Sequence, residues 1–255
     1  MIARFLLAFW LLLQVSVAGP GNQLLLSYKA PVASGSITVT GAAKNSGTTS
    51  TLSATISPSA GELLVVFFGE YGTSAIDATV TDNLGSAGWT KAGSVLNTST
   101  TGIGISCWYL ANASASITTV TATRSTGSSD ATICVHRVSG CSTSSPFTTG
   151  ELATNTGTAV TSGSTGNLTN ATANSILFAG IINSSGANPA TLTINSTGTT
   201  GTWNLYNSTN SQELNGTAHM TISCPNIVVS SSSARGHGWA FEASQRYAAM
   251  AVAFH

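Results

Sequence analysis

Short apolar runs, separated by glycine and small polar residues, recur along the whole chain. The strongest runs predict strands at residues 62–68, 102–110, 131–138, 175–182 and 247–254. In a weaker set, Thr or Ser alternates with apolar residues, at 36–40, 51–57, 116–123, 190–194 and 217–223. Such alternation is typical of strands that turn one face to the core and the other to water.

Turn signals separate these runs at intervals typical of β proteins. Asp82-Asn83-Leu84-Gly85 and Asn215-Gly216 are examples, since Asn, Asp and Gly readily adopt the backbone angles of tight turns. No convincing amphipathic helix is present. The pattern therefore predicts an all-β fold, a two-sheet antiparallel β-sandwich that is jelly-roll-like in its connections.

A faint internal repeat suggests that the sandwich consists of two similar halves, 36–140 and 150–255. The alternative is that Ser/Thr-rich β chains resemble themselves anywhere. The polar stretch 139–170 is expected to form loops and edge strands between the halves, or else an interdomain linker. Four pairs of segments keep their order at offsets from 113 to 117: 59–66 with 172–179, 88–90 with 202–204, 105–107 with 222–224, and 131–135 with 248–252.

The N-terminus reads as a secretory signal peptide. Arg4 precedes the apolar run 5–13, and Ser16-Val17-Ala18 supplies small residues for cleavage before Gly19. An uncleaved anchor is the alternative, but the run is shorter than the roughly 20 residues of a membrane-spanning helix. We therefore expect a secreted protein without a membrane span after signal removal. The expected organisation is a signal peptide (1–18), an N-terminal segment (19–35) and a sandwich domain (36–255).

Charged residues are scarce. The chain has 8 Lys and Arg and 8 Asp and Glu, against 75 Ser and Thr, whereas a soluble domain is usually about 25% charged. Without Arg4 the formal charge is −1, from seven basic and eight acidic side chains. Nucleic acid is not an expected partner, because phosphate binding needs clustered Lys and Arg. The composition predicts a neutral surface that forms hydrogen bonds through hydroxyls and amides.

Catalytic patterns are missing from the sequence. It has no G-x-S-x-G elbow and no H-E-x-x-H motif, and its carboxylates are dispersed. Glu70 and Asp77 flank one loop, but ordinary solvation explains them. His136 is expected to be a satisfied core residue, and His237, between two glycines, an exposed turn residue. We therefore expect no enzymatic activity, and a secreted hydrolase remains the third-ranked alternative.

Aromatic and acidic residues supply the candidate ligand sites. Tyr71, Trp108 and Trp239 are candidates for stacking on a sugar, with packing in the core as the alternative. Adjacent Trp108 and Tyr109 must point to opposite faces of a strand. Calcium is the one cofactor considered, since it takes oxygen ligands from loops. Its candidate ligands are Asp77, Asp82 and Asn83, although turn hydrogen bonds also explain Asp and Asn at these positions.

Four cysteines are disulfide candidates in an exported chain: Cys107, Cys134, Cys141 and Cys224. Four cysteines allow three pairings, and the sequence does not choose among them. The alternative is that they are small buried residues that keep their thiols.

Several segments resemble a known group of proteins. They are AGELLVVFFGEYG, VTDNLGSAGWTKAGS, GISCWYLAN, ATICVHRVSGCSTSSPF and YAAMAVAFH. Together they resemble uncharacterised β-sandwich proteins found among secreted bacterial proteins and in phage or metagenomic sequences. The resemblance covers roughly residues 35–255 and implies a jelly-roll-like sandwich with no assigned activity. Cys134 and Cys141 depart from it, since small or aliphatic residues are expected there.

These observations favour an extracellular, non-catalytic surface or adhesive module. Its partner would be a cell-surface glycan or protein. The second hypothesis is a structural subunit of a filament, surface layer or virion that self-associates. In that case the apolar strand 24–28 would pair with the sheet edge of a neighbour, the alternative being that it pairs within its own sheet.

Overall fold

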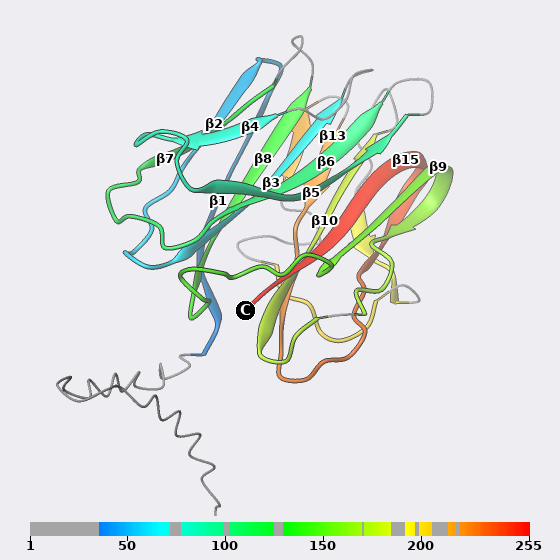
Figure 1. The fold of residues 1–255 in the computed structure, drawn as a ribbon. Helices are drawn as coiled ribbons and strands as arrows, with labels where there is room; N and C mark the ends of the chain where they lie inside the picture. The colour runs from blue at the N-terminus through cyan, green and yellow to red at the C-terminus, as the bar shows by residue number, and fades with distance from the viewer. Residues whose placement is uncertain are drawn as a thin grey trace, which may run out of the picture. The chain divides into compact units, whose positions relative to one another are not determined.

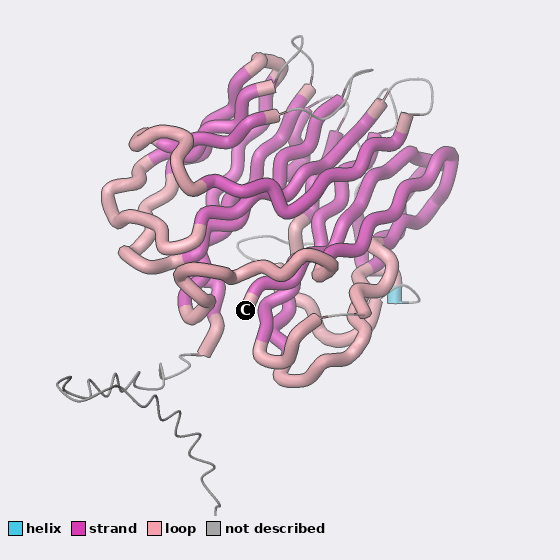
Figure 2. The backbone as a smooth tube through the Cα atoms, viewed as in Figure 1, coloured by secondary structure: helices cyan, strands magenta, loops and turns pink. Residues whose placement is uncertain are grey.

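A computed structural model gives the fold of this chain. It describes residues 36–71, 78–98, 102–124, 130–169, 171–184, 192–196, 199–205, 214–217 and 220–255. The predicted signal peptide (1–18) and N-terminal segment (19–35) lie outside the described residues. Apart from a 3-10 turn at Ser196, the regular structure in the described part of the chain consists of strands in antiparallel sheets, which confirms the all-β sandwich (Figures 1 and 2).

The first sheet has five strands in the order β1-β8-β3-β6-β5. Their bounds are β1 Thr38–Gly47, β3 Leu63–Tyr71, β5 Trp89–Asn97, β6 Ile103–Leu110 and β8 Ala131–Ser139. The central strand β3 is buried on both faces, which explains its unbroken apolar sequence.

The second sheet is built around the last strand of the chain, β15. β15 pairs with β9 on one side and with β10 and β11 on the other, and β10 continues to β13, β12 and β14. The bounds are β9 Leu152–Ser164, β10 Ser175–Ser184, β11 Leu192–Ile194, β12 Leu214–Thr217, β13 Met220–Ser223, β14 Asn226–Val229 and β15 Gly238–Phe254.

A third, small sheet adds a layer that the two-sheet expectation did not include. It has the order β2-β7-β4, with β2 Thr51–Thr55, β4 Thr79–Asp82 and β7 Thr119–Thr123. Leu64, Val66 and Phe68 on one face of β3 pack against this sheet. The jelly-roll-like connectivity stays a prediction.

The opposite face of β3 packs against the second sheet. Val65 and Phe67 share a core with Ile176 and Phe178 of β10, and the rings of Phe67 and Phe178 are 6.2 Å apart. We call this cluster the inner core. Gly180 also faces it, and a Cβ there would lie 2.5 Å from Cδ1 of Phe67, so only glycine allows this approach. The outer face of β10 packs into a further core that contains Trp203 and Trp239.

The connectivity of the first sheet recurs in the second, where the corresponding order is β9-β15-β10-β13-β12. The registers agree as well. Phe68 pairs with Ser106 in β6, and Ile181 pairs with Ser223 in β13, at offsets of 113 and 117. Strands β1 to β8 fall within residues 36–140, and β9 to β15 fall within residues 150–255.

The last strands of the two halves, β8 and β15, correspond at an offset of 116. The sequence match of 131–135 with 248–252 has an offset of 117, so it is displaced by one residue from the structural match. Leu63 pairs with Val138, whereas Ile176 pairs with Phe254. A displacement of one residue matters, because it would move every side chain to the other face of the sheet.

The predicted strands agree well with the structure. All five strong runs and all five weaker runs form or overlap strands, and the turn at 82–85 is present with two backbone hydrogen bonds between Asp82 and Gly85. The polar stretch 139–170 contains β9, which lies outside β15 at the edge of the sheet. Strands β4, β5, β12 and β14 were not predicted from the sequence.

Candidate functional site

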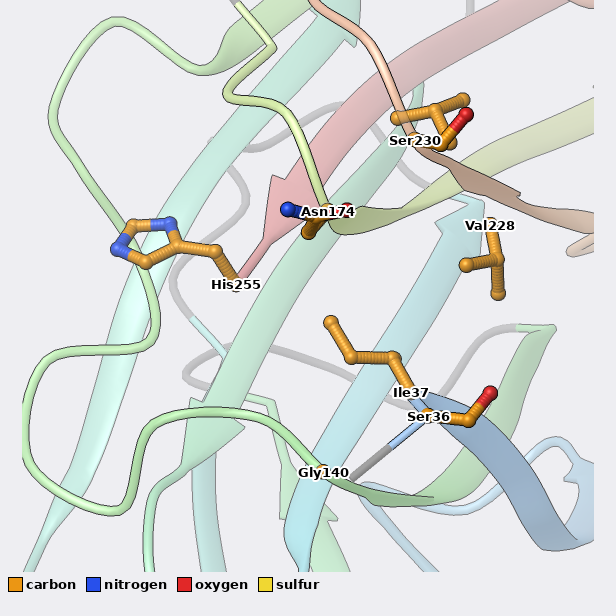
Figure 3. Close-up of a pocket in the computed structure, with 8 residues that line it drawn as sticks. Ser36, Ile37, Gly140, Asn174, Val228, Ser230 and His255 are labelled. Carbon is orange, nitrogen blue, oxygen red and sulfur yellow. The ribbon is translucent and has the colours of Figure 1, made fainter. Parts of the chain in front are cut away.

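The inner core opens to the surface between the start of β1 and strand β14 (Figure 3). Two adjoining cavities of about 390 and 380 Å³ share Ser36, Ile37 and Val228, and each has the size of a ligand pocket. We call their combined lining the mouth. Its other residues are Thr38, Val39, Gly140, Asn174, Asn204, Leu205, Asn226, Val229, Ser230 and His255.

Ile37 and Val228 supply the apolar surface of the mouth. Ile37 is half-buried and packs against the inner core. Ile227 and Val229 are buried in the outer core. Val228 must therefore point to the inner side, because side chains alternate along a strand. It is 48% exposed there, and Val228 and Leu84 are the exposed large apolar side chains among the described residues.

Strand β14 also presents backbone groups at its outer edge. Its inner edge pairs with β10, and at its outer edge Asn226 exchanges two hydrogen bonds with Asn204, at 2.7 and 2.8 Å. Outward-pointing peptide groups recur at every second residue of an antiparallel strand. The N–H and C=O of Val228 therefore point toward the same edge, where no further strand pairs with β14 among the described residues.

Two residues with left-handed backbone angles shape the walls. Gly140 follows β8 at φ +87°, and Asn174 precedes β10 at φ +60°. Glycine adopts such angles without strain, and Asn is among the residues that tolerate them best. They turn the chain away from each strand and leave the space between Ile37 and Val228 open. In Figure 3, Ile37 and Val228 lie on different sides of this space.

His255 closes one end of the mouth. Its backbone is held by two hydrogen bonds, from the N–H of Ser142 at 2.8 Å and to the C=O of Pro146 at 2.9 Å. Its Nδ1 lies 3.5 Å from Oε2 of Glu151. The buried Glu151 carboxylate also accepts hydrogen bonds from the N–H and hydroxyl of Thr172 at 3.1 and 2.6 Å, so it fixes the loop that leads to Asn174.

The chemistry of the mouth is neutral. His255 is its one ionisable side chain among the described residues, and the rest are aliphatic, hydroxyl, amide and glycine groups. No Trp or Tyr lines it among these residues, so the described lining presents no aromatic face to a sugar ring. Exposed backbone groups beside an aliphatic surface suit an extended, uncharged polypeptide segment.

The structure corrects the expectation for Trp239. Its side chain is fully buried, its Nε1 donates to Oγ of Ser223 at 3.1 Å, and its ring lies 4.5 Å from that of His237. It cannot stack on a ligand at the surface. His237, expected in an exposed turn, is buried too.

Tyr71 and Trp108 are half-buried and lie apart from the mouth. Tyr71 packs against the inner core and Trp108 against the core under the small sheet, so they do not form one platform. Each ring has a cation over it at 5.9 Å, Arg246 for Tyr71 and Lys91 for Trp108. Trp108 and Tyr109 face opposite cores, which confirms the expected alternation. Glycan binding stays a prediction.

The candidate calcium ligands serve the turn before β5. Asp82 accepts hydrogen bonds from the N–H of Leu84 at 2.7 Å and from Nε1 of Trp89 at 2.9 Å. Asn83 Oδ1 accepts from the N–H of Thr118 at 2.7 Å. Asp77 lies outside the described residues, within which no group of three His, Cys, Asp or Glu side chains gathers to hold a metal. Calcium stays a prediction.

All four cysteines carry thiols in this structure. Cys107 and Cys134 both pair with Phe67, from opposite sides of β3. They are therefore two strand spacings apart, roughly 10 Å, which exceeds the 7 Å limit for the Cα atoms of a disulfide. This geometry excludes the pairing of Cys107 with Cys134 and leaves the other pairings as predictions.

Two further buried carboxylates have structural partners. Glu70 lies 2.9 Å from Nε of Arg124, and Glu62 lies 3.0 Å from Nε of Arg137. Burial acts to raise the pKa of Glu62, but hydrogen bonds from Arg137, Thr40 and Ser59, with the charge of Arg137, hold it below its ordinary value. Such a carboxylate stays ionised and serves as an anchor for β1 and β8.

Comparisons with protein families, with curated proteins and with solved structures found no match for this chain. The resemblance to secreted and phage β-sandwich proteins therefore stays a prediction. Within the described ranges, no helix is both long and apolar enough to cross a membrane.

Proposed function

We propose that this protein is a non-catalytic extracellular surface module that binds an extended polypeptide segment in the mouth. The observation that carries the proposal is the exposed Val228, whose side chain and peptide groups face an aliphatic groove at the edge of a sheet. A peptide strand added there gains main-chain hydrogen bonds from the edge and side-chain burial from the groove.

The other features of the molecule support a binding role over catalysis. Buried Glu62, Glu70 and Glu151 are engaged by arginine, threonine or histidine partners that hold loops and strands together. The signal-like N-terminus and the scarcity of charge support an extracellular location. Glycan binding is the less favoured role, because the mouth lacks aromatic side chains among its described residues.

A fluorescein-labelled hexapeptide of alternating Val and Thr tests the proposal. We expect saturable binding by fluorescence anisotropy, weakened at least about tenfold by Val228→Lys, because a cation in the apolar groove must be desolvated when the peptide covers it. Leu84→Lys is the matched control, since Leu84 is also an exposed aliphatic side chain, at 58% against 48% for Val228, but lines a different cavity. It should bind as the unchanged protein does. Binding that is absent, or that is insensitive to Val228→Lys, contradicts the proposal.

A further inference from the structure

The described part of the chain begins at the mouth. Ser36, its first residue, lines both cavities, and Ile37 follows on the wall opposite Val228. The residues that precede it, 19–35, belong to the predicted mature protein. The predicted strand 24–28 therefore precedes, in the chain, a groove that suits a strand.

The chemistry of that segment matches the mouth. Residues 19–28, GPGNQLLLSY, contain no charged side chain, and 24–26 are three leucines flanked by Gln23 and Ser27. The aliphatic groove requires apolar side chains, and its neutral rim requires the absence of charge, because an unpaired buried charge is costly.

The linker 29–35 has seven residues, more than the two to five of a usual hairpin loop, so the segment is not confined to the mouth of its own chain. Fully extended, seven residues reach roughly 24 Å, which is enough to leave one mouth and enter that of a neighbour.

We infer that residues 23–28 of one copy occupy the mouth of a second copy, so that the protein polymerises head to tail. This inference rests on the proposed function and names its partner. The groove and the segment are different surfaces, so the contact is heterologous and leaves a free mouth at one end and a free segment at the other. Such contacts build open chains unless the rotation between copies closes a ring.

Two variants and their mixture test the inference, each made in the full chain. Val228→Lys places a cation in the mouth, so this variant should not accept a segment, while its own residues 23–28 are unchanged. The double variant Leu25→Asp/Leu26→Asp places charges on both faces of the expected strand, so its segment should not bind, while its mouth is unchanged. Analytical ultracentrifugation of the unchanged protein should show oligomers that lengthen with concentration, and each variant alone should sediment as a monomer.

The mixture provides the sharper result. At a one-to-one ratio the two variants should form a dimer and nothing longer, because one intact segment meets one intact groove. Leu84→Lys should polymerise as the unchanged protein does. An unchanged protein that is monomeric at all concentrations, a mixture that stays monomeric, or a loss of assembly in Leu84→Lys overturns the inference.

The outcome also separates the inference from the proposed function. A monomeric protein whose mouth still binds the Val/Thr hexapeptide keeps the proposed function and removes the second copy as its partner. Loss of both hexapeptide binding and assembly removes both.

Discussion

His237 lies between two indole rings. The ring of Trp203 is 5.2 Å away and that of Trp239 is 4.5 Å away, both edge-on. Neither ring nitrogen of His237 has a hydrogen-bond partner, and burial lowers its pKa to about 4. The folded protein therefore holds this imidazole neutral, whereas the unfolded chain protonates it near pH 6.5.

The free energy of unfolding should consequently depend on pH between about 4 and 6.5. The unfolded state binds more protons in this window, so stability is full above pH 6.5 and falls as the pH drops toward 4, by up to about 3 kcal/mol. Urea unfolding followed by tryptophan fluorescence at pH 7 and pH 4.5 measures the difference. His237→Phe should reduce it, while His255→Gln, at a partly exposed position, serves as the control. An equal pH dependence in His237→Phe refutes the assignment.

The burial of His237 could not be predicted from the residues next to it in the sequence. Flanking glycines suggest a surface turn, but the burial of His237 comes from Trp203, which lies 34 positions earlier in the chain. The burial of Trp239 could not be predicted for the same reason. In contrast, the opposite orientations of Trp108 and Tyr109 follow from strand geometry alone, and the structure has them so.

Asn97, the last residue of β5, joins the first sheet to the second. Its Nδ2 donates to the C=O of Gly157 in β9 at 2.8 Å and to that of Tyr247 in β15 at 3.1 Å. The side chain is buried, so each carbonyl depends on this amide for part of its hydrogen bonding.

Asn97→Ala should lower the free energy of unfolding by about 1–3 kcal/mol, because it leaves buried carbonyl groups without this donor. Urea titration monitored by circular dichroism measures the change. Thr158→Val is the matched control, since its hydroxyl meets Asn97 only at 3.4–3.5 Å, and it should change stability by less than about 0.5 kcal/mol. Equal effects of the two substitutions contradict the role assigned to Asn97.

At the scale of elements, strands with a dense apolar run could be predicted from the sequence. Strands of polar sequence, which form because a neighbouring strand pairs with them, could not. Residues 176–182 have no polar side chain, as expected for a strand with both faces buried. β9 has a mainly hydroxyl and small-residue sequence, and it becomes a strand through its long pairing with β15. The mouth escaped prediction because Ile37 and Val228, 191 positions apart, have no shared local pattern.

At the scale of the whole molecule, the four cysteines gather in or against the inner core. Burial raises the pKa of the Cys107 thiol, and it raises that of the half-buried Cys141 to about 12. Thiols react as thiolates, so both should be inert at ordinary pH.

We expect 5,5′-dithiobis(2-nitrobenzoic acid) at pH 8 to modify less than one thiol per folded molecule within minutes, and four in guanidinium chloride. The colour yield of the released thionitrobenzoate gives both numbers. Treatment with dithiothreitol, removed by gel filtration before denaturation, should leave the count of four unchanged. Two thiols or fewer in the denatured, unreduced protein contradict the thiol assignment and demonstrate a disulfide.

The position of β15 within its sheet has a consequence for the order in which the molecule can form. The strand pairs with β9 and β10 on opposite sides, and it follows both of them in the chain. During synthesis the second sheet therefore lacks its middle until β15 has been made. Contacts between such distant residues also form slowly. The edges of β9 and β10 that flank β15 therefore stay unpaired until this strand is in place.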